Sequence, residues 1–237
     1  MEYDNIAMIG DMENVRYMLK KEGTHILYVI GLNPSTADNE KPDPTIQKVM
    51  GFAEINGFDG FAMFNIYPQR STNPDGLHRE CDDGLHSKNL SIIQAEFCNI
   101  RQPVILLAYG NAIETRNYLK TCLRDITDLL QPLHPQWKQI GALTRLGHPR
   151  HPLYARYELL NNYTMIPWEI IQEMKNQGCN QVSFLGLSNG MEVYSIGEVD
   201  KDGIPVPTGL PVLLLWDGKH IEEKNVNQAL ELLGTLV

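Results

Sequence analysis

Polar side chains follow three apolar runs of the sequence, at the points where each run stops. They are Asn33 and Asp38, Asn65 and Arg70, and His148 and His151. An amide or a carboxylate can orient water, and a protonated imidazole can face an anionic leaving group. In an open α/β sheet, ligands bind beyond the carboxyl ends of the strands. The three turns therefore predict one polar site at one edge of a sheet.

The turn from Gly31 to Asp38 is the richest of the three. It follows the run 26–30, which is apolar on both faces as in a strand of a parallel sheet. Gly31 and Asn33-Pro34 then supply turn chemistry, and the hydroxyls of Ser35 and Thr36 come next. A second polar turn at residues 43–45 opens a predicted helix.

Strands and helices alternate through the first part of the chain. The pattern predicts strands at 25–30, 61–64, 104–108 and 140–144, and helices at 44–56, 85–99 and 112–123, after a short helix or lead-in at 14–21 that ends at Gly23. This alternation is typical of βαβ units. We therefore expect an α/β fold with a four-stranded parallel sheet over residues 1–165.

The character of the sequence changes after residue 165. Strands at 182–187 and 191–196 flank a Ser-Asn-Gly turn, which is a hairpin signal. A strand at 212–216 and an amphipathic helix at 225–236 follow. Residues 166–237 are therefore expected to form a small α+β appendage.

Composition narrows the classes of function. The chain has 237 residues, 43% of them hydrophobic, and no apolar run of the roughly 20 residues that a membrane span needs. Its acidic N-terminus does not resemble a secretory signal, and its four widely spaced cysteines favour reduced thiols, so we expect a cytoplasmic protein without a membrane partner. The net charge of −9 favours a small ligand or short nucleotide over non-specific DNA binding.

Cofactor and metal motifs are missing from the sequence. His148 and His151 have no third ligand at metal-site spacing. The chain has no dinucleotide-binding glycine motif, no phosphate-binding lysine loop and no nucleophile elbow. We therefore expect no metal and no other cofactor.

Several motifs together resemble the family called domain of unknown function 1643. They are Arg16-Tyr17-x-Leu19, the turn 31–38, Asp43-Pro44-Thr45-Ile46 and His151-Pro152-Leu153-Tyr154, in that order. The resemblance covers residues 14–160 and leaves out the C-terminal appendage.

More distantly, the layout resembles the uracil-DNA glycosylase superfamily. That resemblance implies a four-stranded parallel sheet between helical layers, with Asn33 holding the attacking water, Asn65 reading a base and His151 bonding the base carbonyl. Ser35 and Leu153 depart from the superfamily's glycine and serine at these places. Cys81 and Cys98 match two of four cluster cysteines, so no iron–sulfur cluster is expected.

These arguments predict hydrolysis of an N-glycosidic bond, with a nucleobase, nucleotide or single-stranded nucleic acid as the partner. The expected catalytic residues are Asn33, Asp38 and His151. The expected substrate-binding residues are Gly31, Pro34, Ser35, Thr36, Asn65, Tyr67, Arg70, Gly110, Asn111, His148, Arg150 and Tyr154. Two alternatives stay open: a non-catalytic nucleotide or nucleic-acid binding module, and an interaction protein that uses its C-terminal appendage.

Overall fold

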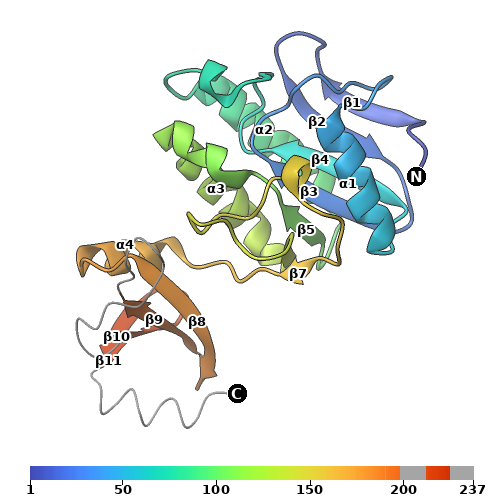
Figure 1. The fold of residues 1–237 in the computed structure, drawn as a ribbon. Helices are drawn as coiled ribbons and strands as arrows, with labels where there is room; N and C mark the ends of the chain where they lie inside the picture. The colour runs from blue at the N-terminus through green and yellow to red at the C-terminus, as the bar shows by residue number, and fades with distance from the viewer. Residues whose placement is uncertain (190, 198–211, 225–237) are drawn as a thin grey trace. The chain divides into compact units, whose positions relative to one another are not determined.

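The protein forms two compact units in a computed structural model that describes residues 1–189, 191–197 and 212–224. The first unit is Met1–Tyr163 and the second is Thr164–Val237. Figure 1 shows the elements of each unit. The helix predicted at 225–236 lies outside the described residues. No helix within the described part of the chain is both long and apolar enough to cross a bilayer.

A large mixed sheet of seven strands forms the centre of the first unit, in the order β1-β2-β4-β3-β5-β6-β7. Its strands are β1 (Ile6–Gly10), β2 (Arg16–Lys21), β3 (Ile26–Gly31), β4 (Gly60–Asn65), β5 (Val104–Leu107), β6 (Gln136–Gln139) and β7 (Asn161–Asn162). β4, β3, β5 and β6 pair in parallel, whereas β1, β2 and β7 are joined antiparallel. The α/β class is confirmed, but the sheet is larger than predicted and mixed.

The sequence pattern misjudged two segments of this sheet. The predicted lead-in helix at 14–21 is wrong, because Arg16–Lys21 is strand β2, which pairs with both β1 and β4. Tyr17, Met18 and Leu19 are consecutive and all buried, so the run shows no alternation that would distinguish a strand from a buried helix. The strand predicted at 140–144 forms instead at Gln136–Gln139. This segment is mostly polar, so it lacks the apolar run by which the other strands were predicted.

Helices cover both faces of the sheet (Figure 1). They are α1 (Pro44–Ile55), α2 (Asp83–Phe97) and α3 (Asn117–Leu130), with short 3-10 turns at η1 (Pro74–Gly76), η2 (Gly110–Thr115), η3 (Gln131–Leu133) and η4 (Pro152–Tyr154). The apolar side of α1 joins the core cluster that includes Leu27 and Val29 of β3. Phe97 of α2 packs on Tyr28 and Phe64, which point to the opposite face.

The start of α1 is set by local chemistry. The carboxylate of Asp43 accepts the N–H of Ile46 at 2.9 Å, and Pro44 takes the first helical position. The loop after β3 is thereby joined to a rigid helix at a fixed point.

In the described residues of the second unit, a helix packs on an antiparallel sheet. Helix α4 (Trp168–Asn176) is followed by β8 (Gln181–Ser188), β9 (Met191–Gly197), β10 (Val212–Trp216) and β11 (Ile221–Lys224), in the sheet order β11-β10-β9-β8. Ile170 of α4 shares a buried cluster with Tyr194 and Leu214 of the sheet. α4 and β11 were not predicted from the sequence.

Replacing Leu19 tests the placement of β2. Leu19 is fully buried, so Leu19→Ala should lower the free energy of unfolding by about 2–5 kcal/mol. Ile9→Ala on the neighbouring strand is the control, because Ile9 is 40% exposed and should cost about 0.5 kcal/mol or less. Guanidinium unfolding followed by circular dichroism measures both, and equal effects would contradict the buried strand.

Candidate functional site

A cavity of about 600 Å³ opens at the carboxyl ends of β3, β4 and β5. The loop after β3, the first turn of α1, the loop after β4, the turn after β5 and the segment 144–154 all contribute to its wall. The lining residues are Arg16, Gly31, Leu32, Asn33, Ser35, Thr36, Asp43, Pro44, Thr45, Ile46, Met63, Ser71, Thr72, Pro74, Tyr109, Gly110, Asn111, Ala112, Thr144, Arg150, His151, Leu153 and Tyr154.

The structure brings together a part of the residues that the sequence singled out. Those that line the cavity are Gly31, Asn33, Ser35, Thr36, Gly110, Asn111, Arg150, His151 and Tyr154. Those outside the lining are Pro34, Asp38, Asn65, Tyr67, Arg70 and His148. The convergence of turns at one sheet edge holds, but several of the polar groups serve the structure of the turns themselves.

The side-chain nitrogen of Asn33 is bonded within the turn, whereas its side-chain oxygen is left for a ligand. Its Nδ2 donates to the carbonyls of Pro34, at 3.0 Å, and Ser71, at 2.8 Å. Because both donors are used, the amide orientation is fixed. Its Oδ1 has no donor within the described part of the chain, so it can accept a hydrogen bond from water or a ligand.

Asp38 holds a turn rather than a water molecule. Its Oδ1 accepts the backbone N–H groups of Glu40 and Lys41, each at 2.8 Å, and these bonds lower the carboxyl pKa. The side chain does not line the cavity. The geometry gives no support to the catalytic role that the sequence suggested for Asp38.

Arg70 is likewise a clamp for backbone carbonyls. Its Nε donates to Asp11, at 2.9 Å, and its Nη1 donates to Ser35, at 2.8 Å, and Ala37, at 3.0 Å. Its Nη2 contacts the sulfur of Met8. With its donors engaged by backbone carbonyls and no place in the cavity lining, Arg70 lacks the geometry of the substrate contact expected from the sequence.

Tyr67 and His148 also lie outside the cavity wall. The hydroxyl of Tyr67, a fully buried residue, bonds Nδ1 of His78 at 2.9 Å and accepts the N–H of Asp82 at 3.0 Å. Burial raises the pKa of Tyr67 to about 12. His148 is 2.8 Å from the carboxylate of Glu114. Neither ring is placed to stack on or bond a ligand in the cavity.

His151 is the histidine that reaches the cavity. The backbone N–H of Leu153 donates to its Nδ1 at 3.3 Å, and burial lowers the pKa of its imidazole. A neutral ring whose Nδ1 accepts must carry its proton on Nε2. Gly110 makes room for it, with a φ of +65° and a position where a Cβ would come 3.0 Å from His151 Cβ.

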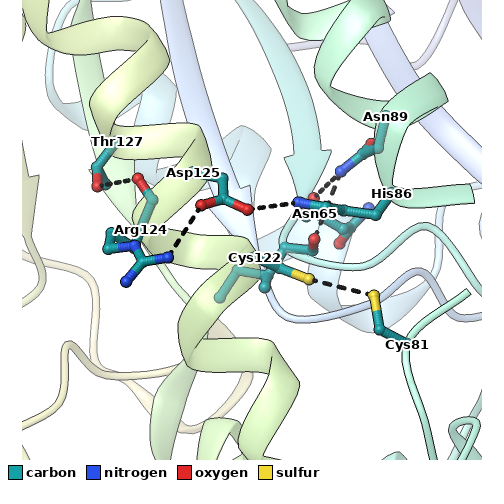
Figure 2. Close-up of polar contacts among 9 residues, drawn as sticks. Asn65, Cys81, His86, Asn89, Cys122, Arg124, Asp125 and Thr127 are labelled. Carbon is teal, nitrogen blue, oxygen red and sulfur yellow. Dashed lines mark hydrogen bonds and ion pairs between the residues drawn. The ribbon is translucent and has the colours of Figure 1, made fainter. Parts of the chain in front are cut away.

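Asn65 lies directly behind the cavity wall. A Cβ on Gly31 would come 3.0 Å from Asn65 Oδ1 and 2.4 Å from Cε of Met63. Asn65 is fully buried, and neither its Oδ1 nor its Nδ2 has a hydrogen-bond partner among the residues that the structure describes. Its backbone carbonyl accepts Nδ2 of Asn89 at 2.9 Å (Figure 2). An unpaired buried amide is costly, so this side chain is available to a partner that the protein itself does not supply.

Sequence reasoning missed two charged residues of the cavity. Arg16 is 2% exposed, its Nη1 donates to the carbonyl of Ala37 at 2.9 Å, and burial lowers its pKa to about 10. Asp43, 6% exposed, accepts the N–H groups of Ile46 and Ala37. Arg16 lies in the segment that was predicted as a helix, so it was not expected at the sheet edge. Asp43 was predicted only as part of the turn that opens a helix.

The cysteines and histidines form no recognisable metal centre within the described residues. No group of three or more His, Cys, Asp or Glu side chains is arranged there to hold an ion. Cys81 Sγ lies 3.8 Å from Cys122 Sγ (Figure 2), and Cys98 is exposed.

The first unit is therefore an α/β protein with a polar cavity at the carboxyl ends of its parallel strands. Within this class, residues 16–153 match the family described as protein of unknown function (DUF1643). The match spans more than half of the 237 residues, so the chain belongs to this family. Comparison with curated proteins gave no match, and comparison with solved structures gave none either.

The lowered pKa of His151 predicts an effect of pH on stability. The unfolded chain binds a proton near pH 6.5, and the folded chain binds it only at lower pH. The free energy of unfolding should therefore fall as pH drops below about 6.5, and less steeply in His151→Gln. Urea unfolding between pH 7.5 and 5 measures the two slopes. Parallel curves would show that His151 titrates normally.

Proposed function

We propose that the cavity binds a nucleotide and hydrolyses its N-glycosidic bond. The observation that carries the proposal is the neutral imidazole of His151, whose Nδ1 is occupied by the N–H of Leu153 at 3.3 Å. Its Nε2–H is a fixed hydrogen-bond donor in the same cavity as the free acceptor Oδ1 of Asn33. A donor held in place can stabilise negative charge that develops on a departing base.

The reaction divides between these two side chains. Asn33 Oδ1 accepts a hydrogen bond from water and orients it toward the anomeric carbon of the sugar. As the water oxygen bonds to that carbon, the carbon–nitrogen bond breaks and its electron pair moves to the base. His151 Nε2–H bonds a carbonyl oxygen of the base while the negative charge is there. The proton that water loses balances the proton that the base gains from solvent.

Two further groups favour a base as the ligand. The unpaired amide of Asn65 offers a donor nitrogen beside an acceptor oxygen, which complements the donor and acceptor groups on the edge of a pyrimidine. Movement of the flexible end of Met63, beside Gly31, would open Asn65 to the cavity. Tyr154 is 86% exposed at the cavity and Tyr109 lines its wall, so these two rings are the candidates for stacking on a base.

The proposal includes a uracil-DNA glycosylase-like arrangement of the central strands. β4, β3, β5 and β6 are adjacent and parallel, with α1 on one face and α2 on the other. This pattern supports the four-stranded core that the sequence resemblance implied. It places Asn33, Asn65 and His151 at or beside one edge.

A second candidate function is nucleotide binding without catalysis. Asp43 is the one carboxylate among the lining residues, and both of its oxygens already accept backbone N–H groups. The cavity thus offers water no carboxylate with an unoccupied oxygen. A binding module would need no such group.

Substitution of His151 separates the two functions. Base release from nucleosides, nucleotides and short single strands can be followed by chromatography at high enzyme concentration. His151→Ala should lower kcat by about 100- to 1,000-fold through loss of the donor. His151→Gln, which keeps an N–H near the Nε2 position, should retain part of the activity.

His25→Gln is the matched control, because His25 is an exposed residue just before β3, at the end of that strand away from the cavity. It should leave the rate unchanged. Binding of a nucleotide without base release from any of these substrates would favour the binding module and overturn the hydrolase.

A further inference from the structure

Arg16 keeps a buried positive charge that the protein does not fully pair. The residue is 2% exposed, and its buried Nε has no acceptor in the described part of the chain. Its Nη1 reaches the carbonyl of Ala37, which is neutral. Among the described residues it forms no ion pair. Burying a guanidinium without an acceptor for its N–H groups is costly, so a group that fills this role from the cavity would be bound strongly.

The N-terminus of α1 meets the same cavity. Pro44, Thr45 and Ile46 form the first turn of this twelve-residue helix and line the cavity wall. Asp43 takes the N–H of Ile46, and Pro44 has no N–H to offer. The N–H of Thr45 is left without an acceptor in the described part of the chain. A free amide at a helix N-terminus favours an anion through both its hydrogen bond and the helix dipole.

Asp43 is the charge that opposes this assignment. Burial lowers the pKa of the Arg16 guanidinium, and Asp43 is the charge that opposes this shift most strongly. Its Oδ2 accepts the N–H of Ala37 at 3.2 Å and its Oδ1 the N–H of Ile46 at 2.9 Å, so its oxygens point into the backbone of the loop and helix. With Arg150 also on the wall, the ionised groups lining the cavity sum to positive in a chain of net charge −9.

We propose that Arg16 and the N-terminal amide of α1 bind the phosphate monoester of the ligand, which is then a nucleoside monophosphate. This assignment rests on the proposed function and narrows its substrate class. A phosphate monoester carries close to two negative charges and several acceptor oxygens at neutral pH, enough for a guanidinium and an amide together. A diester inside a polymer has a sugar on each side and is less suited to a nearly enclosed arginine.

Binding of matched ligands to the full chain tests the assignment. Calorimetric titration should show a nucleoside 5′-monophosphate binding about 10- to 100-fold more tightly than the nucleoside. Inorganic phosphate should raise the melting temperature and compete with the monophosphate. Arg16→Gln should remove the preference and leave nucleoside affinity unchanged, whereas Arg16→Lys should keep part of it.

Two controls separate the phosphate contact from other effects of the substitution. Arg101→Gln removes one positive charge from an exposed site outside the cavity and should keep the full preference. Arg70→Gln loses bonds to the carbonyls of Ser35 and Ala37 and so loosens the same loop, although Arg70 itself does not line the cavity. Loss of the preference in Arg70→Gln to the same extent as in Arg16→Gln would trace the effect to the loop and overturn the assignment.

If Arg16→Gln does not fold, affinities measured on the wild-type chain alone still test the phosphate site. Equal affinity for nucleoside and monophosphate, or for a 5′-carboxylate analogue and the monophosphate, would overturn the phosphate site. Phosphate-dependent binding without base release would sink the hydrolase and support the site. Base release from nucleosides as fast as from monophosphates would overturn the phosphate site and support the hydrolase.

Discussion

The backbone of Ala37 is the point on which the cavity depends. Its carbonyl accepts hydrogen bonds from both Arg16 and Arg70, and its N–H donates to Asp43. These contacts tie β2, the loop after β4 and the start of α1 to one peptide. In the same loop, Asn33 donates to the carbonyls of Pro34 and Ser71, which leaves its Oδ1 as an acceptor for a ligand. A less constrained loop would leave these side chains without a common geometry.

The two arginines that bond the Ala37 carbonyl differ in role, because Arg70 stabilises the loops and Arg16 is left partly unpaired for a ligand. Arg70 does not line the cavity and donates to backbone carbonyls, whereas Arg16 lines the cavity and has a buried Nε with no acceptor among the described residues. Asn65 repeats this pattern with an amide. Proteins rarely leave buried polar atoms unpaired, and such atoms mark places where function outweighs stability. Among the described residues with such atoms, Arg16 lines the cavity that also holds His151, and Asn65 lies directly behind its wall, whereas His86 and Asn89 do not line it.

The sequence foretold the buried strands β3, β4 and β5 and the turns that follow them, because each apolar run ends in residues with strong turn chemistry. It failed at β2, where successive buried residues show no periodicity, and at β6, whose residues are mostly polar. Asn33 and His151 could be selected from their motifs. The roles of Asp38 and Arg70 could not, because both depend on which distant carbonyls and N–H groups come within reach after folding.

A crystal structure of the chain with a bound nucleoside monophosphate tests this account most directly. The account predicts the base in the cavity, with a carbonyl oxygen at hydrogen-bond distance from His151 Nε2, and the phosphate against Arg16 and Thr45. A nucleotide bound elsewhere on the first unit would contradict it. So would a nucleotide in the cavity whose base makes no contact with His151.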